Sequence, residues 1–208
     1  MSAQLDQAQA HLRDADPQLA VWMDRVDTQS LPAPRRFTLV DALARSILYQ
    51  QLHGKAAATI VARVEQALGS TRITAAGLRD IDEQALRAAG VSGGKVRALK
   101  DLAQHANARL LPSTARLRTL DDQQIVDALT VVRGIGPWTV HMLLIFRLGR
   151  PDVLPVSDYG VRAGAQLVHG LDELPDARQL TALAEPWRPY RSLASLYLWR
   201  ALDWSRNQ

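Results

Sequence analysis

The sequence predicts an all-α protein. Apolar residues recur at the three- and four-residue spacing of amphipathic helices through most of the 208 positions, and the alternation typical of strands is almost absent. Capping residues, prolines and glycines also divide this periodicity into short segments. Regular interruptions of this kind are typical of helices joined by short loops and packed into a bundle.

The first half of the chain begins its helices at Asp16-Pro17, where an acidic N-cap precedes proline at the first helical position. The proline-rich segment 31–36 breaks this helix and is expected to be a linker. Gly69 is expected to end a later helix as its C-cap. The helices expected in this half are a segment from 17 to about 26, 37–49, 55–68, 75–79 and 83–88.

Two glycine-rich turns organise the second half, at 90–94 and at 134–136. Residues 151–157 are expected to be extended, with Ser157 or Asp158 capping the helix that follows. The helices expected here are 95–109, one from 121 or 122 to 131, 137–148, one beginning at 158 and ending near 168, 176–184 and 189–204.

Composition excludes several classes of protein. There is no cysteine, so disulfides, thiolate zinc sites and iron–sulfur clusters are excluded. No apolar run is long enough to span a membrane, and residues 1–6 lack the layout of a secretory signal. The net charge is +4, and 22 of the 25 basic residues are arginine, which binds phosphate bidentately. This balance permits nucleic-acid binding without establishing it, and the sequence favours a cytoplasmic location.

The segment Gly134-Ile135-Gly136, followed by Pro137, is the most informative motif. It predicts a tight hairpin in which Ile135 anchors the turn in the core while backbone N–H groups face outward. Such amides favour an anion, although an ordinary αα-hairpin has the same pattern.

Asp158 is the candidate catalytic carboxylate. An N-cap is the simplest interpretation of an acidic residue at this position. The alternative is a carboxylate held at a cleft, where it could stabilise the cationic sugar that develops when a glycosidic bond is cleaved.

Tryptophans are numerous, at five against two phenylalanines. Trp138 directly follows the hairpin and Trp199 lies on a late helix, so each is a candidate for stacking on a cationic ring as well as for the core. The polar break at 50–54 is either a plain loop or a plug for a gap left by an extruded base. The five histidines form no cluster with metal-ligand spacing.

Taken together, these segments resemble the helix-hairpin-helix DNA glycosylases of base-excision repair, and among them the compact 3-methyladenine DNA glycosylase II of the AlkA type. The resemblance covers nearly the whole chain. The segments that carry it are 14–20, 47–52 with 55–57, 91–95, 133–139, 154–159, 186–192 and 197–200.

The resemblance implies an enzyme that flips an alkylated base out of damaged DNA and hydrolyses its N-glycosidic bond. Asp158 matches the catalytic aspartate, and the base pocket would be lined by Trp138, Met142, Tyr159 and Trp199. DNA would be contacted by the hairpin residues Arg133, Gly134, Ile135, Gly136 and Thr139, and by Gln51, Leu52 and His53 at the position of the wedge. Tryptophan at 138 replaces the lysine of related lyases, so a monofunctional enzyme is expected.

The resemblance also implies two helical lobes, 37–147 and 1–36 joined to 148–208, with the active site at their junction. No cofactor is expected, although the hairpin carbonyls of Gly134 and Gly136 could hold a monovalent cation. We expect damaged DNA as the partner, no membrane or protein partner, a monomer, and a place at the nucleoid of a bacterial cytoplasm.

Two alternatives stay open at this stage. The chain could excise uracil or another mismatched base, as other members of the superfamily do. It could also be a non-catalytic helix-hairpin-helix DNA-binding module, in which Asp158 only caps a helix. The sequence does not determine which alkylated base is preferred. The candidates are 3-methyladenine, 7-methylguanine, 1-methyladenine and 3-methylcytosine.

Overall fold

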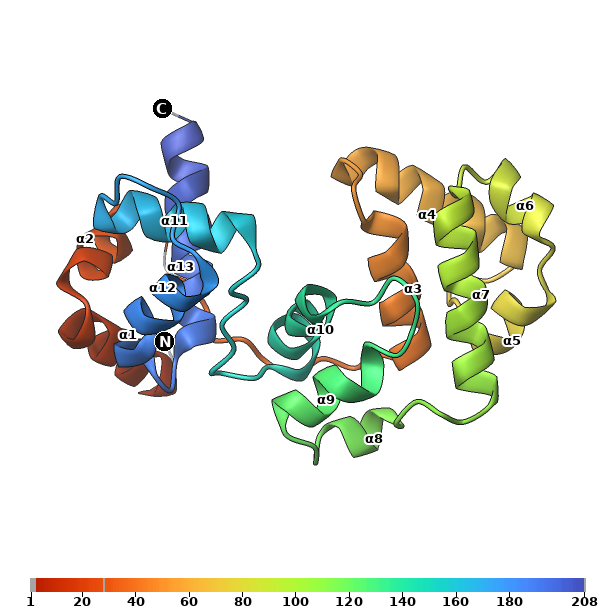
Figure 1. Cartoon of the computed structure of the whole chain (residues 1–208), viewed down its shortest axis with the longest axis horizontal. Helices are drawn as coiled ribbons and strands as arrows, with labels where there is room; N and C mark the ends of the chain where they lie inside the picture. The colour runs from red at the N-terminus through yellow and green to blue at the C-terminus, as the bar shows by residue number, and fades with distance from the viewer. Residues whose placement is uncertain (1–2, 28, 208) are drawn as a thin grey trace. The chain divides into compact units, whose positions relative to one another are not determined.

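The computed structural model describes residues 3–27 and 29–207, and within these ranges the chain is helical without a strand (Figure 1). The all-α prediction is therefore confirmed. Backbone contacts divide the chain into two compact units. We call the described part of 1–35 with 141–208 the terminal unit, and 36–140 the central unit. The division falls within α10, earlier than the boundary after 147 that the sequence suggested.

The terminal unit is built around the packing of two helices from the second half of the chain, α11 and α13. Its core also includes side chains from the N-terminal helices α1 and α2, such as Leu12 and Leu19, which are fully buried. The elements of this unit are α1 (Ala3–Ala15), α2 (Pro17–Arg25), the π-helix η1 (Leu144–Leu148), α11 (Tyr159–His169), α12 (Ala177–Leu183), η2 (Glu185–Trp187) and α13 (Arg191–Arg206).

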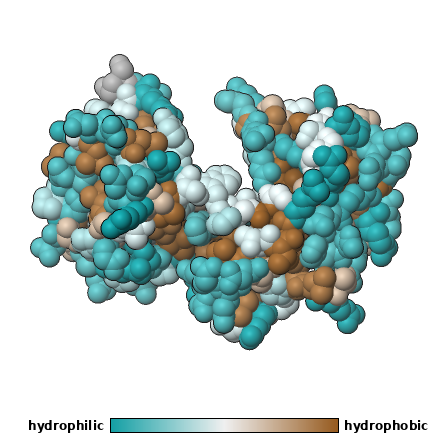
Figure 2. Space-filling view, in the orientation of Figure 1, coloured by the Kyte–Doolittle hydropathy of each residue, from teal (hydrophilic) through white to brown (hydrophobic). Residues whose placement is uncertain are grey.

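The central unit is organised around α7, which packs against α3, α5 and α6 (Figure 1). On the face shown in Figure 2 the surface of each unit is largely hydrophilic, as expected of helices that bury one stripe. The elements of the central unit are α3 (Leu39–Tyr49), α4 (Gly54–Leu68), α5 (Ala75–Asp80), α6 (Glu83–Ala88), α7 (Gly93–Asn107), α8 (Thr114–Leu117), α9 (Asp122–Leu129) and the beginning of α10 (Pro137–Leu143).

Several boundaries differ from those that the sequence suggested. Residues 3–15 and 114–117 form helices that were not expected. The helix expected over 137–148 changes at Leu144 from α to π geometry, and Arg150 N–H donates to the Leu144 carbonyl as it ends. Gly149 follows with φ +67°, and a side chain there would lie 2.6 Å from the Pro34 nitrogen. Glycine is thus required for both the turn and the close approach of the linker.

A buried polar network joins three elements of the terminal unit. The Asp16 carboxylate caps α2 through Leu19 N–H at 2.9 Å, and its Oδ2 accepts bonds from Trp187 Nε1 at 2.7 Å and His169 Nε2 at 2.9 Å. His169 Nδ1 lies 3.0 Å from the Ala165 carbonyl. Both ring nitrogens of His169 therefore face acceptors, and this requires the protonated imidazolium.

The pKa values of the two titratable groups agree with this geometry. Burial acts to lower the pKa of His169, but the hydrogen bond and charge of Asp16 outweigh it and raise that pKa above its ordinary value. Burial acts to raise the pKa of Asp16, but the bonds from His169, the Leu19 amide and Trp187 outweigh it and lower that pKa. The network is therefore an ion pair that fixes α2 against α11.

None of the described helices combines the length and the apolar character that a bilayer crossing requires.

Candidate active site and nucleic-acid-binding hairpin

Asp158 stands at the start of α11, at the end of the segment that the sequence predicted to be extended. Its own N–H donates to the Pro155 carbonyl at 2.8 Å, and this closes the turn. Its Oδ1 accepts the Val161 N–H at 2.8 Å, so Asp158 is the N-cap of the helix. The capping interpretation is thus confirmed, and it places the carboxylate at the positive end of the α11 dipole.

Trp199 meets Asp158 from α13. The indole Nε1 donates to the same Oδ1 atom at 2.8 Å, so this oxygen accepts two N–H groups from two different helices. The structure thereby brings together two residues that lie 41 positions apart in the sequence. Hydrogen bonds to a carboxylate stabilise its charged form and fix its orientation.

Two glycines of α11 explain how the indole can come so close. A Cβ on Gly160 would lie 2.7 Å from Trp199 Cδ1 and 3.1 Å from Asp158 Oδ1, while one on Gly164 would lie 2.4 Å from the Leu198 carbonyl oxygen. The distances of 2.7 Å at Gly160 and 2.4 Å at Gly164 are far shorter than ordinary contacts between packed atoms. Sequence reasoning did not single these residues out, although the Gly-x-x-x-Gly spacing directly after Asp158 is a signal for close helix packing.

Phe146 extends this cluster with a second aromatic ring. Its ring stacks on Trp199 with centroids 5.9 Å apart and an interplanar angle of 24°. Phe146 lies in the π-helical turn η1 and is 44% exposed. Sequence reasoning had no signal for this residue, since a π-helix is not apparent in the apolar pattern.

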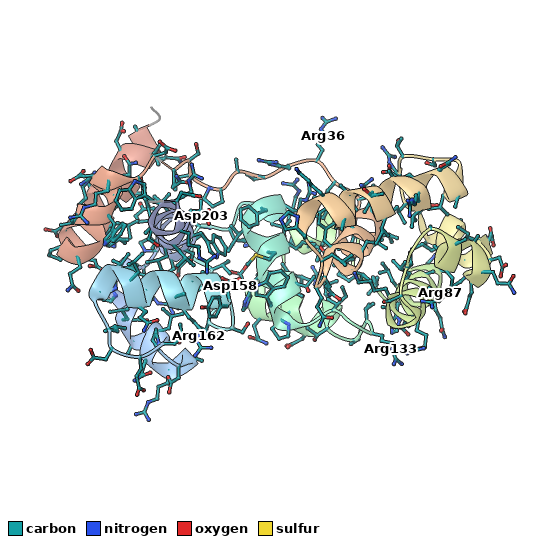
Figure 3. All side chains as sticks on the ribbon, turned by 90° about the horizontal axis from the view of Figure 1, so that it is seen from above. Arg36, Arg87, Arg133, Asp158, Arg162 and Asp203 are labelled. Atoms are coloured by element: carbon teal, nitrogen blue, oxygen red, sulfur yellow. The ribbon has the colours of Figure 1, made fainter. Side chains whose placement is uncertain are left out.

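The other residues expected in the base pocket are distributed over both units. Tyr159 is exposed at the first position of α11, next to Asp158, and Met142 is partly buried near the end of α10. Trp138 belongs to the central unit, where it is 42% exposed at the second position of α10. Within the terminal unit the structure therefore brings Trp199 and the unexpected Phe146 to Asp158, which Tyr159 follows in the chain. Asp158 is labelled in Figure 3.

The hairpin of the central unit has the backbone that its glycines predicted. Gly134 has φ +80°, a conformation that favours glycine, and Ile135 is buried in the core. Among the described residues, no protein acceptor is bonded to the amides of Gly134 or Gly136. Thr139 is only 3% exposed, and the DNA contact expected of it stays a prediction.

Contacts from two other segments hold the hairpin in place. Arg133 N–H donates to the Asp101 carboxylate of α7 at 2.7 Å, and the Gly134 carbonyl accepts the Gln50 side-chain amide at 2.8 Å. The second bond ties the hairpin to the loop that carries the expected wedge residues Gln51, Leu52 and His53. All three are exposed, and Gln51 adopts a left-handed conformation with φ +54°.

The described residues contain no group of three or more acidic, histidine or cysteine side chains able to hold a metal ion. The Gly134 oxygen accepts the Gln50 amide, and the Gly136 oxygen accepts Val140 N–H at 3.2 Å as a helical bond. Each carbonyl oxygen has a second lone pair, and the monovalent cation expected at the hairpin stays a prediction.

The helical fold, the glycine hairpin of the central unit and the capped carboxylate of the terminal unit are accompanied by a match to a known family. The family model described as HhH-GPD superfamily base excision DNA repair protein matches residues 44–189, and the chain belongs to this superfamily. The sequence-based resemblance is thereby confirmed.

Individual members of the superfamily align with most of this chain. DNA-3-methyladenine glycosylase 1 of Schizosaccharomyces pombe is 35% identical over 161 residues, which are 77% of this chain and 71% of that protein. The solved structure of S. pombe Mag1 in complex with abasic DNA matches with a TM-score of 0.82 at 31% identity, covering 93% of this chain and 95% of that one. A DNA-3-methyladenine glycosidase from Bacillus halodurans matches with a TM-score of 0.83 at 32% identity, covering 95% and 89%.

Proposed function

We propose that this protein is a monofunctional DNA glycosylase, a hydrolase that removes alkylated bases flipped out of DNA. One observation carries the proposal: the Asp158 carboxylate is oriented by N–H groups from α11 and Trp199, and the partly buried Trp199 stacks on the exposed Phe146. The names of the relatives, which describe 3-methyladenine glycosylases, support this choice of substrate class.

Hydrolysis of the N-glycosidic bond of an alkylated base requires a carboxylate that stabilises the developing sugar cation, and it requires little acid catalysis. As the bond from sugar C1′ to the base nitrogen breaks, both electrons leave with the base and the sugar becomes cationic. The negative charge of Asp158 stabilises that cation electrostatically. A water molecule then bonds to C1′, and Asp158 accepts the proton that the water releases.

The aromatic stack gives the site its preference for damaged bases. Alkylation at a ring nitrogen makes the base cationic, so it departs as a neutral molecule and requires little protonation. Electron-rich rings such as those of Trp199 and Phe146 attract a cationic ring placed against them. Neutral bases gain less from the same surface and are poorer leaving groups.

The central unit would bind the DNA backbone and open the stack. The amides of Gly134 and Gly136 have no acceptor of their own in the described chain, and a phosphate oxygen would provide one. Gln51, Leu52 and His53 are exposed on the loop that Gln50 ties to the hairpin, in a position to fill the space of the flipped base. Trp138 retains the pocket role implied by the resemblance.

The test is to identify the bases that the enzyme releases. Duplex DNA treated with a methylating agent and duplex DNA containing uracil are incubated separately with the protein, and free bases are measured by mass spectrometry. We expect methylated purines from the first substrate, little uracil from the second, and an unbroken strand at the abasic site. Release of uracil alone would favour the mismatch alternative, and release of no base would leave only a DNA-binding role.

The remaining expectations concern the oligomeric state, the location in the cell and the cofactor requirement. We propose that the protein acts as a monomer at the nucleoid of a bacterial cytoplasm and needs no cofactor. Full base release by gel-filtered monomer in the presence of a chelator would agree with this, whereas activity restricted to an oligomeric fraction would contradict it.

A further inference from the structure

The second glycine-rich turn, residues 90–94, has no part in the proposed mechanism, yet arginines gather around it. A side chain on Gly93 would begin 3.7 Å from Arg97 Nη1 and 3.9 Å from Arg87 Nη1. One on Gly90 would begin 3.9 Å from Arg63 Nη1. Three guanidinium groups, from α4, α6 and α7, therefore border a turn that has no side chains of its own at these two positions.

These arginines differ from others of the central unit in their partners. Arg45 pairs with two carboxylates and Arg79 with a third. Among the described residues, no carboxylate pairs with Arg63, Arg87 or Arg97, and all three are exposed. Arg87 Nη1 donates to the Val91 carbonyl at 2.9 Å, which holds that guanidinium beside the turn.

Like charges that border the same turn without a protein counter-charge repel each other, so an external anion that joins them is favoured. Arginine forks fit the oxygens of a phosphate especially well. The nearby Lys95 does not share this role, because its Nζ donates to the Leu48 carbonyl at 2.8 Å and is directed toward the end of α3.

The position of the cluster on α7 relates it to the hairpin. Asp101 of α7 binds the Arg133 amide, and Arg97 precedes Asp101 by four residues. Residues four apart lie on the same face of a helix, one turn or about 5–6 Å apart. Arg97 therefore lies one helical turn from the contact that anchors the hairpin. In Figure 3 Arg87 lies on the same side of the central unit as Arg133, and Arg36 extends from the opposite side.

One helical turn corresponds to a short stretch of DNA. Successive phosphates of one strand rise about 3.4 Å along the axis, so a separation of about 5–6 Å corresponds to one or two phosphates. We propose that Arg63, Arg87 and Arg97 form an arginine patch that binds backbone phosphates of the same DNA that the hairpin grips. This proposal rests on the proposed function for the identity of the polyanion.

The test is the salt dependence of DNA binding. The dissociation constant of a fluorescent duplex is measured from 50 to 200 mM KCl for the wild type, for R97Q and for R87Q/R97Q. Each phosphate contact adds about 0.9 to the slope of log K against log salt. We expect R97Q to lower the slope by about 0.9 and the double variant to lower it by about 1.8, one phosphate contact for each arginine.

R36Q is the matched control, because Arg36 is an exposed arginine on the opposite side of the same unit. It should leave the slope unchanged. R97Q keeps the bond from Arg87 to Val91, so it remains informative if the double variant unfolds. If R97Q kept the wild-type slope of log K against log salt, or if R36Q lowered that slope as much as R97Q does, the proposed arginine patch would be overturned.

Base release separates this proposal from the proposed function. At saturating enzyme the single-turnover rate of R36Q should equal that of the wild type, because Arg36 lies outside both the patch and the candidate site. If the wild type releases no base, the proposed function fails while the salt slopes still decide the patch.

Discussion

Gly160→Ala tests whether the close approach of Trp199 is what orients Asp158. The new methyl carbon would lie 2.7 Å from Trp199 Cδ1 and 2.9 Å from Nε1, whereas packed carbon atoms prefer about 3.5–4.0 Å. The indole must then retreat by roughly 1 Å. That movement stretches the 2.8 Å bond from Nε1 to the Asp158 carboxylate beyond hydrogen-bond range.

The size of the effect follows from three terms. Overpacking costs about 1–3 kcal/mol, and a lost hydrogen bond to a charged group costs about 1.5–3 kcal/mol. Alanine returns up to about 1 kcal/mol of helix propensity over glycine. We expect the free energy of unfolding to fall by about 1.5–6 kcal/mol and the melting temperature by about 3–24 °C. Misplacing the carboxylate should slow base release by about 100-fold.

The assay combines thermal unfolding with single-turnover base release from methylated duplex DNA. Gly94→Ala is the matched control for stability, because Gly94 is also the second residue of its helix and a Cβ there meets nothing within 4 Å. Gly94→Ala should be as stable as the wild type or more stable. A Gly160→Ala protein that melts and turns over like the wild type would refute the steric argument.

Three further predictions concern hydrogen bonds seen in the structure. Trp199→Phe keeps an aromatic ring but loses the donor to Asp158, so single-turnover base release should fall about ten- to hundredfold; a wild-type rate would contradict a positioning role for the indole. Gln50→Ala removes the bond to the hairpin carbonyl, so the duplex affinity measured by fluorescence anisotropy should fall about two- to tenfold; unchanged affinity would show that the tether is dispensable. The raised pKa of His169 means that the stability from its charged form is complete below pH 6.5 and is lost as the pH rises through the folded-state pKa. The lowered pKa of Asp16 keeps its contribution present down to below pH 3.8. The difference in melting temperature between the wild type and His169→Gln should therefore be largest near pH 6 and shrink toward pH 9, and a difference that grows with pH would contradict the ion pair.

The sequence predicted the features that depend on local chemistry. Asp16 before Pro17, the glycines of the hairpin and Asp158 at the start of α11 each showed a cap or a turn within a few residues. Such signals survive in a single sequence because a helix end must satisfy its own amides nearby. The helix over 3–15 was overlooked although Leu5, Ala8 and Leu12 have helical spacing.

Long-range contacts could not be predicted in this way. Gln50 binds Gly134 across 84 positions of the sequence, and neither segment contains a signal that predicts this contact. The importance of Gly160 depends on a tryptophan brought by a different helix. Phe146 lies in a π-helical turn, which the apolar pattern of the sequence does not reveal, and its stacking partner Trp199 comes from a different helix. These residues are defined by packing, and packing appears only in the folded chain.

Base release by Asp158→Asn is the most direct measurement of the central claim. Asparagine is as good an N-cap as aspartate, and its side-chain oxygen can still accept from Val161 and Trp199, so the substitution removes charge with little effect on the fold. Asp176→Asn makes the same change at the N-cap of α12. If the carboxylate stabilises the sugar cation, Asp158→Asn should lose about 100-fold or more of the single-turnover rate, while Asp176→Asn and the melting temperatures stay close to the wild type. A rate for Asp158→Asn within about tenfold of the wild type would contradict the catalytic role.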